Sequence, residues 1–408
     1  MVTGGRILLG AFLVFVLPIS SSPVWASASS RLYLVDSQFN PPVSRIYQVD
    51  PTSAALVLKA DLGVTYTPFF GMAAADAATL YLTGTDTSPA NLCTTFVSCL
   101  LLRVVLDPGS TTPAETEVIG VLTLNGNMVG DFTGLTFRSD GRLYGISQET
   151  DSLYRIDPAT AHVTLVGSAG IDLHGGDISF DDQDRLWVWT NIGAGDGLYQ
   201  MDPETGQATP YELHPNLDFS GMAALGHGSV LYGANAPTDK LYALDLFGGL
   251  NGGTLMTLNG QPFDHRRGDL DSPYCDDDGS CADEDLCTSD ACSPGGCLHS
   301  AIAGCCLVDA ACDDGNACTR DLCQANQCVS IPLVVDDGNP CTEDLCDPLM
   351  GTVHLPVQGC CLADPDCDDF IPCTADACEG NRCVHGPVEG CVPPPPDKVH
   401  RTVRGPES

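Results

Sequence analysis

The stretch FTGLTFRSDGRLYGISQETDSLYRIDPATAHVTLVGS, residues 132–168, decides the fold of the first two thirds of the chain. It contains four short apolar runs, LTF, LYGIS, SLYRID and VTLVG, which are separated by turn-forming residues such as Gly, Asp and Pro. Runs of this length that are rich in Val, Leu, Tyr and Thr and bounded by turn residues are typical of β-strands. The stretch therefore predicts a unit of four short strands.

The same unit recurs along residues 31–265. Clear copies follow at 175–213 and 219–258, and less regular copies precede at 31–62 and 69–123. Each copy has a Leu-aromatic pair: Leu32-Tyr33, Leu80-Tyr81, Leu143-Tyr144, Leu186-Trp187 and Leu231-Tyr232. Four copies also have a later Asp-Pro, at Asp50-Pro51, Asp107-Pro108, Asp157-Pro158 and Asp202-Pro203, and the fifth has Asp245-Leu246 there.

Four strands in a unit of about 43 residues are the signature of a β-propeller blade. One blade cannot bury both of its faces alone, so blades pack on one another and ring closure protects the terminal faces. We therefore predict a mainly β protein with a propeller of five four-stranded blades over residues 31–265. The first copy lacks a clear innermost strand before Leu32, and a sixth, degenerate blade is the alternative.

The DGRLYGIS…LYRIDPATA pattern of residues 140–161 resembles the secreted NHL-like and quinoprotein-like propellers. The resemblance implies the propeller fold, which proteins with many different activities share. The second copy is stretched, and Cys93 and Cys99 lie in its extra length. We expect these two cysteines to form a local disulfide that staples an inserted loop, because a redox pair is more usually spaced C-x-x-C.

The N-terminal segment and the composition predict export. Residues 1–28 have the features of a secretory signal peptide: Arg6, the apolar run Ile7–Pro18, and the small residues Ala26-Ser27-Ala28 before a cleavage point. The alternative, a membrane anchor, needs about 20 apolar residues, more than this run provides. The chain has 22 cysteines, which favours an oxidising compartment, so we expect a secreted or extracellular protein, with the periplasm or the cell surface as alternatives.

The charge excludes some classes of partner. The 408 residues include 53 acidic and 17 basic side chains, a formal charge of −36. Nucleic acids and anionic membranes require clusters of Lys and Arg, so neither nucleic-acid binding nor membrane insertion is expected. The remaining partners are a protein or a glycan at the cell surface or in a matrix.

Residues 269–391 form a different region, an acidic cysteine array. They hold 20 of the 22 cysteines, and 25 acidic residues against two arginines and no lysine, a formal charge of −23. Such a segment cannot build a large apolar core and needs covalent links. We expect little regular secondary structure there and a Pro-rich, disordered tail at 392–408.

The cysteine spacing divides the array into the units 275–305, 306–328, 335–360 and 361–391. The first and last units share the frame C-x5-C-x5-C-x4-C-x4-C-x7-C, with Cys275, Cys281, Cys287, Cys292, Cys297 and Cys305 in one and Cys361, Cys367, Cys373, Cys378, Cys383 and Cys391 in the other. The second unit keeps the first five positions, Cys306, Cys312, Cys318, Cys323 and Cys328. The third keeps the third, fourth and sixth, Cys341, Cys346 and Cys360.

These losses suggest a disulfide pairing, although other schemes also fit the spacing. The third unit loses its second and fifth cysteines together, at Val335 and Gly351, as expected of partners. The two incomplete units hold odd numbers of cysteines, so at least one bond should cross between them. A nested scheme predicts Cys281–Cys297, Cys312–Cys328 and Cys367–Cys383; Cys287–Cys292, Cys318–Cys323, Cys341–Cys346 and Cys373–Cys378; and Cys275–Cys305, Cys306–Cys360 and Cys361–Cys391.

The array resembles the slime-mould extracellular-matrix repeat, a short cysteine-rich module with a C-T-x-D-x-C centre. That centre appears as CTSDAC (287–292), CTRDLC (318–323), CTEDLC (341–346) and CTADAC (373–378). The resemblance implies a role at or outside the cell surface and implies no catalytic residues. Because Val335 and Gly351 depart from the frame, the third unit is the one whose independent folding is in question.

Two kinds of metal site are conceivable in the array. Zinc is disfavoured because the cysteine count is even and no C-x2-C is present, although His299, His354 and His385 follow cysteines or their equivalents. Weak Ca²⁺ binding is predicted where acidic residues cluster, the alternative being a solvated acidic surface whose Asp residues serve turns. The candidate ligands are Asp276, Asp277, Asp278, Asp313, Asp314, Asp336, Asp337, Asp366, Asp368 and Asp369.

Catalytic signatures are weak. The sequence has no G-x-S-x-G, H-E-x-x-H or phosphate-binding loop. Polar residues next to the first strand of several blades could converge on a propeller axis, namely Asp131, His174, Asp177 and Asp218, and the alternative is that they cap turns. We therefore expect a secreted non-enzymatic protein with a propeller binding head and an acidic, disulfide-stapled stalk. The alternative is a secreted propeller enzyme, a metal-dependent hydrolase or a quinoprotein-like oxidoreductase, with the array as an accessory module.

Overall fold

A computed structural model describes residues 31–392 except 40, 65, 88–91, 94–97, 114 and 284. The predicted signal peptide and nearly all of the predicted disordered tail lie outside these residues. The chain divides into two compact units, residues 1–300 and 301–408. None of the helical segments that the structure describes is long and apolar enough to cross a membrane.

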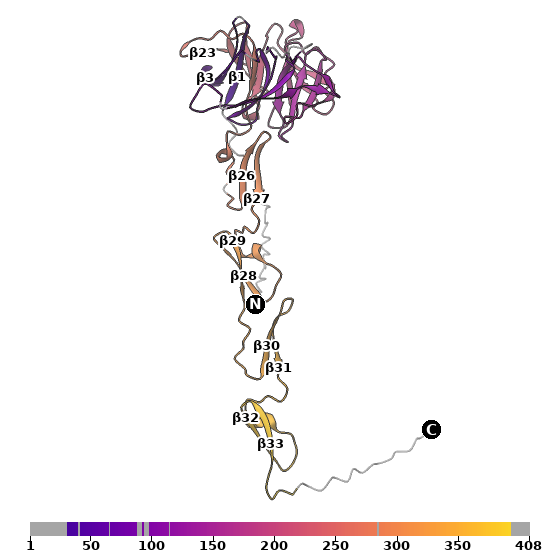
Figure 1. Ribbon diagram of the computed structural model, residues 1–408, viewed down its shortest axis with the longest axis vertical. Helices are drawn as coiled ribbons and strands as arrows, with labels where there is room; N and C mark the ends of the chain where they lie inside the picture. Colours follow the sequence, from indigo (N-terminus) through magenta and orange to yellow (C-terminus); the bar gives the residue numbers. More distant parts are fainter. Residues whose placement is uncertain are drawn as a thin grey trace, which may run out of the picture. The chain divides into compact units, whose positions relative to one another are not determined.

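Residues 32–271 form a five-bladed β-propeller (Figure 1). Four blades follow one another along the chain, each an antiparallel sheet that starts with its innermost strand. They are β4 Phe69–Ala74, β5 Thr79–Gly84, β6 Leu100–Val105 and β7 Glu115–Val121; β10 Phe132–Phe137, β11 Leu143–Ser147, β12 Ser152–Ile156 and β13 Val163–Ser168; β14 Asp177–Phe180, β15 Leu186–Thr190, β16 Gly197–Met201 and β17 Ala208–Leu213; and β18 Gly221–Ala224, β19 Val230–Asn235, β20 Lys240–Asp245, β21 Gly249–Leu250 and β22 Thr254–Leu255.

The fifth blade closes the ring with strands from both ends of the domain. Its outer strands are β1 Leu32–Phe39, β2 Pro42–Val49 and β3 Ala55–Gly63, extended at the edge by β23 Thr257–Leu258 and β24 Gln261–Pro262. Its innermost strand is β25 Gly268–Asp271, which pairs antiparallel with β1, from Asp36 opposite Gly268 to Tyr33 opposite Asp271. The innermost strand that the sequence lacks before Leu32 is therefore supplied from beyond residue 265. The propeller extends past the predicted boundary, and the described residues contain five blade sheets rather than six.

The core lies between the blades. Most aromatic residues of the Leu-aromatic pairs are buried between adjacent sheets, including Tyr33, Tyr144 and Trp187. Trp189 of β15 packs against Phe219, just before β18, with ring centroids 4.1 Å apart. Interlocked faces of this kind are why no single blade is stable alone.

The recurring Asp-Pro ends a strand, as its chemistry predicts. Asp50 accepts hydrogen bonds from the backbone N–H groups of Thr52 and Ser53 and from the Thr52 hydroxyl. These bonds to the charged form lower the pKa of Asp50 to about 2. Asp157 and Asp202 accept equivalent backbone bonds, so the motif is a turn device rather than a site.

Each unit of the cysteine array is built on a two-stranded hairpin that starts at the C-T-x-D-x-C centre. The hairpins are β26 Thr288–Ser293 with β27 Gly296–Ala301, β28 Thr319–Gln324 with β29 Gln327–Pro332, β30 Thr342–Asp347 with β31 Gly351–Pro356, and β32 Thr374–Glu379 with β33 Arg382–Pro387. Short 3₁₀ turns, η3 Asp278–Cys281, η4 Asp309–Cys312 and η5 Asp364–Cys367, precede the first, second and fourth hairpins. In the described residues the third hairpin has no such turn. The three turns end at the second cysteine of their unit, and the third unit has Val335 at that position.

The disulfides follow a simpler rule than the nested scheme. The predicted second-to-fifth bonds Cys281–Cys297, Cys312–Cys328 and Cys367–Cys383 are present, as is the loop bond Cys93–Cys99. First positions, however, pair with fourth ones, and third with sixth, in Cys275–Cys292, Cys306–Cys323, Cys361–Cys378, Cys341–Cys360 and Cys373–Cys391. Cys287 and Cys305 are disulfide-bonded as well, and the described residues include no free cysteine.

The predicted third-to-fourth bonds Cys287–Cys292, Cys318–Cys323, Cys341–Cys346 and Cys373–Cys378 are wrong because those cysteines are separated by an extended strand. Five residues of strand span about 16 Å, whereas bonded cysteines have Cα atoms about 4.4–6.8 Å apart. The predicted first-to-sixth bonds Cys275–Cys305, Cys306–Cys360 and Cys361–Cys391 are wrong because each first cysteine bonds to the fourth cysteine, on the first strand of the hairpin. The expected bond between the two incomplete units exists as Cys318–Cys346.

Candidate functional site

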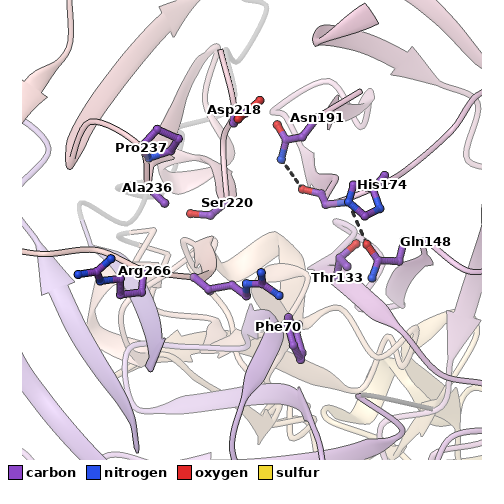
Figure 2. A pocket seen from close by; sticks show the side chains of 13 residues that line it. Phe70, Thr133, Gln148, His174, Asn191, Asp218, Ser220, Ala236, Pro237 and Arg266 are labelled. Carbon is purple, nitrogen blue, oxygen red and sulfur yellow. Dashed lines mark hydrogen bonds between the residues drawn. The ribbon is translucent and has the colours of Figure 1, made fainter. Parts of the chain in front are cut away.

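A polar cavity of about 370 Å³ lies at one end of the propeller axis (Figure 2). All five blades contribute, either from the start of the innermost strand or from the loop before it, and three blades add residues from the loop after the second strand. The lining residues are Phe70, Thr133, Gln148, His174, Gly175, Asn191, Asp218, Ser220, Ala236, Pro237, Arg266, Arg267 and Gly268.

Three of the four predicted axis residues line this cavity or the smaller one beside it. His174 and Asp218 line the cavity, and Asp131 lines a smaller one of about 120 Å³ that shares Thr133 and Arg267 with it. The fourth, Asp177, is fully buried and lines neither cavity.

Sequence reasoning missed the arginine pair Arg266-Arg267 and the ring of Phe70. The pair lies just outside the predicted propeller boundary. The sequence did contain a sign of this pair, because two adjacent arginines are unusual in a chain with a formal charge of −36.

Hydrogen bonds hold the rim of the cavity rigid. Gln148 accepts a hydrogen bond from the backbone N–H of Gly175 through Oε1, at 3.0 Å. Asn191 donates to the Gly175 carbonyl at 2.7 Å (Figure 2). It also donates to the Phe219 carbonyl at 2.7 Å and accepts from the Phe219 N–H. The side-chain amides therefore tie the loops of neighbouring blades together.

The cavity is rich in donors. The guanidinium of Arg267 lies over the ring of Phe70, 5.9 Å from its centroid, an arrangement that orients the cation. The hydroxyl oxygen of Thr133 is buried and has no hydrogen-bond partner in the described structure. Burial and the nearby Asp196 raise the pKa of Asp218.

Buried carboxylates at the axis join the blades. Asp269 of β25 accepts a hydrogen bond from the Met72 N–H of β4 at 2.5 Å, and Asp271 accepts from the Ala74 N–H at 2.7 Å. Asp177 of β14 likewise accepts from the Met222 N–H of β18. These carboxylates therefore take the place of sheet hydrogen bonds between neighbouring innermost strands.

Burial raises the pKa of Asp177 to about 7 and that of Asp269 well above its usual range. The two carboxyl groups also interact with each other, which favours a proton on one of them. Desolvation also raises the pKa of Asp271. Asp177 is thus a structural acid rather than a residue that faces a ligand.

Ser220, His265 and Asp36 form a continuous hydrogen-bonded chain beside the cavity. His265 Nδ1 lies 2.9 Å from Asp36 Oδ1, and His265 Nε2 lies 2.5 Å from the hydroxyl of Ser220, which lines the cavity. The same hydroxyl lies 3.1 Å from the Ala234 carbonyl. The order of groups is that of a nucleophile, a base and an orienting carboxylate, and the three groups also connect the fourth blade (β18–β22) to the closing blade.

Most candidate calcium ligands in the array serve turns. Asp277 caps η3, Asp278 accepts from the Cys292 N–H, and Asp366 accepts from the N–H groups of Leu362 and Ala363. Others accept bonds from backbone N–H groups two residues ahead, namely Asp313, Asp314, Asp336, Asp337, Asp368 and Asp369. Asp276 lies 3.4 Å from Arg31. Calcium binding itself stays a prediction.

The array does bring together carboxylates and histidines that the sequence treated separately. His354 Nδ1 lies 2.7 Å from Asp344 and 3.5 Å from Asp337. The same triplet recurs at Asp283, Asp290 and His299 and at Asp369, Asp376 and His385. In the second repeat Ser330 stands where the histidine would be, and its hydroxyl donates to Asp314.

Comparison with known proteins finds a matching repeat family for part of the cysteine array. Residues 280–302, 311–333 and 334–357 match the Dictyostelium (slime mold) repeat. The cysteine array carries Dictyostelium repeats. Protein psiQ of Dictyostelium discoideum is 31% identical to this chain over 130 residues, which cover 29% of this chain and 12% of psiQ. The chain therefore spans about an eighth of the length of this relative.

Solved structures similar to this chain are distant in sequence. A nidogen/laminin complex aligns at 11% identity over 59% of this chain and 97% of that chain, with a TM-score of 0.36. The PQQ-bound aldose sugar dehydrogenase of Streptomyces coelicolor aligns at 13% identity over 62% of this chain and 88% of that chain, also with a TM-score of 0.36. A catalytically inactive virginiamycin B lyase of Staphylococcus aureus, solved with quinupristin, aligns at 12% identity over 65% and 78%, with a TM-score of 0.34.

Proposed function

We propose that this chain is a secreted, non-enzymatic binding protein of an extracellular matrix or cell surface. Its propeller is the binding head, and its acidic repeats are a disulfide-stapled stalk. The partner is a protein or glycan outside the cell.

One observation carries the proposal: the cavity and the start of the array lie at opposite ends of the propeller. Thr133 near the start of β10 lines the cavity, whereas the carbonyl of Phe137, the last residue of β10, lies 3.4 Å from the Tyr274 hydroxyl. Tyr274, directly before the first array cysteine, stacks on His227 with ring centroids 3.5 Å apart. Residue 274 therefore lies at the end of the propeller opposite the cavity.

The compartment is supported by the cysteines and the repeat. Disulfides persist in oxidising surroundings, and small domains without an apolar core depend on them. The repeats have exposed apolar residues and few buried ones other than cysteine, so the bonds are their main internal support.

The proposal is tested by expressing the full chain in a host with a secretory pathway. We expect it in the medium or the matrix fraction, with no thiol titratable under denaturing, non-reducing conditions. Retention inside the cell with free thiols would overturn the proposal. Turnover of substrates by the purified protein would refute its non-enzymatic part.

A second candidate function rests on Ser220, His265 and Asp36. Asp36 would hold a proton on His265 Nδ1, so that Nε2 could accept the Ser220 proton while Ser220 attacks an ester or amide carbonyl. Labelling of the full chain by a fluorophosphonate, lost in Ser220→Ala, would favour this hydrolase. We favour the structural interpretation because the Ser220 hydroxyl also lies within hydrogen-bonding distance of the Ala234 carbonyl and the three groups connect two blades.

A further inference from the structure

The axial cavity has the chemistry of a site for a small anionic polyol. We propose that it binds a sugar carboxylate, a hexuronate or the uronate end of an acidic polysaccharide. This inference rests on the proposed function, because it specifies the ligand class of the binding head.

The charge of the site supports an anion. The chain has only 17 basic residues, and two consecutive ones, Arg266 and Arg267, border this cavity. Among the described residues, Asp218 is the carboxylate that lines this cavity, and Asp131 lines the smaller one that shares Thr133 and Arg267 with it. Arginine is suited to carboxylates because its planar donors match both carboxylate oxygens.

The position of Arg267 supports a specific contact rather than a diffuse field. Its guanidinium is held over the Phe70 ring, so its orientation is partly fixed before a ligand arrives. The neighbouring Arg266 is paired with Asp264, and its backbone N–H donates to Asp36. Asp264 does not line the cavity, and the backbone bond fixes the segment that presents both arginines.

An unpartnered donor points to a hydroxylated ligand. Thr133 is more than nine-tenths buried, its hydroxyl has no partner, and it lines both cavities. A buried hydroxyl without a hydrogen bond is destabilising, and a ligand oxygen would satisfy it. Gln148 and His174 add further polar groups, so the wall offers hydrogen bonds on several sides of a ligand.

The size of the cavity excludes larger classes. About 370 Å³ is near the lower end of the range for ligand pockets. It accommodates one sugar ring, or two with part of the second in solvent. A fatty-acid chain would leave the polar wall unsatisfied, because the apolar lining side chains are only Phe70, Ala236 and Pro237.

The experiment titrates the full-length, oxidised protein with D-glucuronate and D-galacturonate by calorimetry and by ligand-observed NMR. D-glucose and D-galactose are the neutral counterparts, and acetate and sulfate test charge without a sugar ring. We expect binding of a uronate and at least about tenfold weaker binding of the matching neutral sugar, the size of one charge-assisted hydrogen bond. Acetate and sulfate should bind more weakly than the uronate.

Variants locate the site. Arg267→Gln should weaken uronate binding about tenfold or more, and Thr133→Val, which keeps the shape and removes the hydroxyl, should weaken it less. Arg142→Gln is the matched control, since Arg142 is an exposed arginine that pairs with Asp140 and lines neither cavity. Unchanged thermal unfolding would show that the variants are folded.

Equal binding of glucose and glucuronate, no uronate binding, or full affinity in Arg267→Gln would overturn the inference. If the protein is secreted, fully oxidised and retained in the matrix but binds no uronate, the ligand class is wrong and the proposed function stands. If it binds uronate but stays inside the cell with free thiols, the cavity inference stands and the proposed function is wrong.

Discussion

The buried acid Asp177 leads to a prediction about how the propeller responds to pH. Its pKa of about 7, against an ordinary 3.8, means that the folded state holds a proton that the unfolded state releases. Stability from this group is therefore complete below pH 3.8 and is lost as pH rises through about 7. At 1.36 kcal/mol per pKa unit, the loss is about 4 kcal/mol.

The perturbation is Asp177→Asn, which cannot ionise. We expect the wild-type protein to lose about 3 kcal/mol of unfolding free energy relative to the variant between pH 4.5 and pH 8, since part of the total is already lost at pH 4.5. His227, whose pKa burial lowers to about 4, produces the opposite slope below pH 6.5. Because His227 is present in both proteins, its slope cancels in the difference. The pKa of Asp269 depends on Asp177, so the difference measures the Asp177–Asp269 pair.

The assay is equilibrium unfolding in urea followed by tryptophan fluorescence. Trp189 lies opposite Asp177 in the β14–β15 pair, so the signal reports the blade in question. Asp182→Asn is the matched control, since Asp182 is exposed and makes the same change of charge. If wild type and Asp177→Asn show parallel pH profiles, the carboxylate is ionised in the folded state and the account of the axis is incorrect.

Three further predictions concern other parts of the chain. Replacing Cys318 and Cys346 together by Ser should lower the unfolding free energy by about 3.6 kcal/mol, the chain-entropy value for a 28-residue loop. The same change at Cys93 and Cys99, which close a loop of six residues, should lower it by about 2.2 kcal/mol. Denaturant unfolding of both double variants checks this, and equal losses of unfolding free energy would contradict it. Gly221→Ala should destabilise by about 1–3 kcal/mol, because its Cβ would lie 2.4 Å from the Leu270 nitrogen, whereas Gly252→Ala meets nothing within 4 Å and should leave the melting temperature nearly unchanged. His385 should titrate above pH 6.5 by NMR because Asp376 raises its pKa. Its contribution to stability is therefore present below pH 6.5 and is lost as pH rises through the raised pKa of the folded state. Asp376→Asn should return the titration midpoint of His385 towards 6.5 and leave that of His354 unaffected, and an unshifted midpoint of His385 in the wild type would refute the pairing.

The propeller was predictable from the sequence because each blade repeats its own local signals. The Leu-aromatic pair and the Asp-Pro turn depend on near neighbours, so they can be read in any copy. The closing strand Gly268–Asp271 could not be placed in this way, because its partner Leu32–Phe39 lies more than 200 residues away and the strand is only four residues long. The same short strand carries two of the three axial acids, Asp269 and Asp271, and it follows the arginine pair, which was missed with it.

The disulfide pairing was predictable where cysteines are missing in pairs, but not where it depends on the conformation of the chain between them. Joint loss of the second and fifth cysteines identified true partners. The choice between third-to-fourth and first-to-fourth bonds depends on whether C-T-x-D-x-C is extended or turned, and the spacing alone is compatible with both. The strand Thr288–Ser293 settles the choice, since its ends are too far apart to bond.

The irregular third repeat explains why the bond between repeats exists. The second repeat lacks the sixth cysteine, so its third, Cys318, has no partner within the repeat. The third repeat lacks the first cysteine, so its fourth, Cys346, is also without one, and the two bond to each other.

A backbone bond from the Ala317 N–H to the Pro348 carbonyl, 2.7 Å long, supports the same junction. Because the third repeat retains a single bond of its own, Cys341–Cys360, and lacks the 3₁₀ turn, its order depends on the second repeat. The two incomplete repeats are therefore one covalently linked module, and expressing them as separate chains would leave Cys318 and Cys346 without their partners.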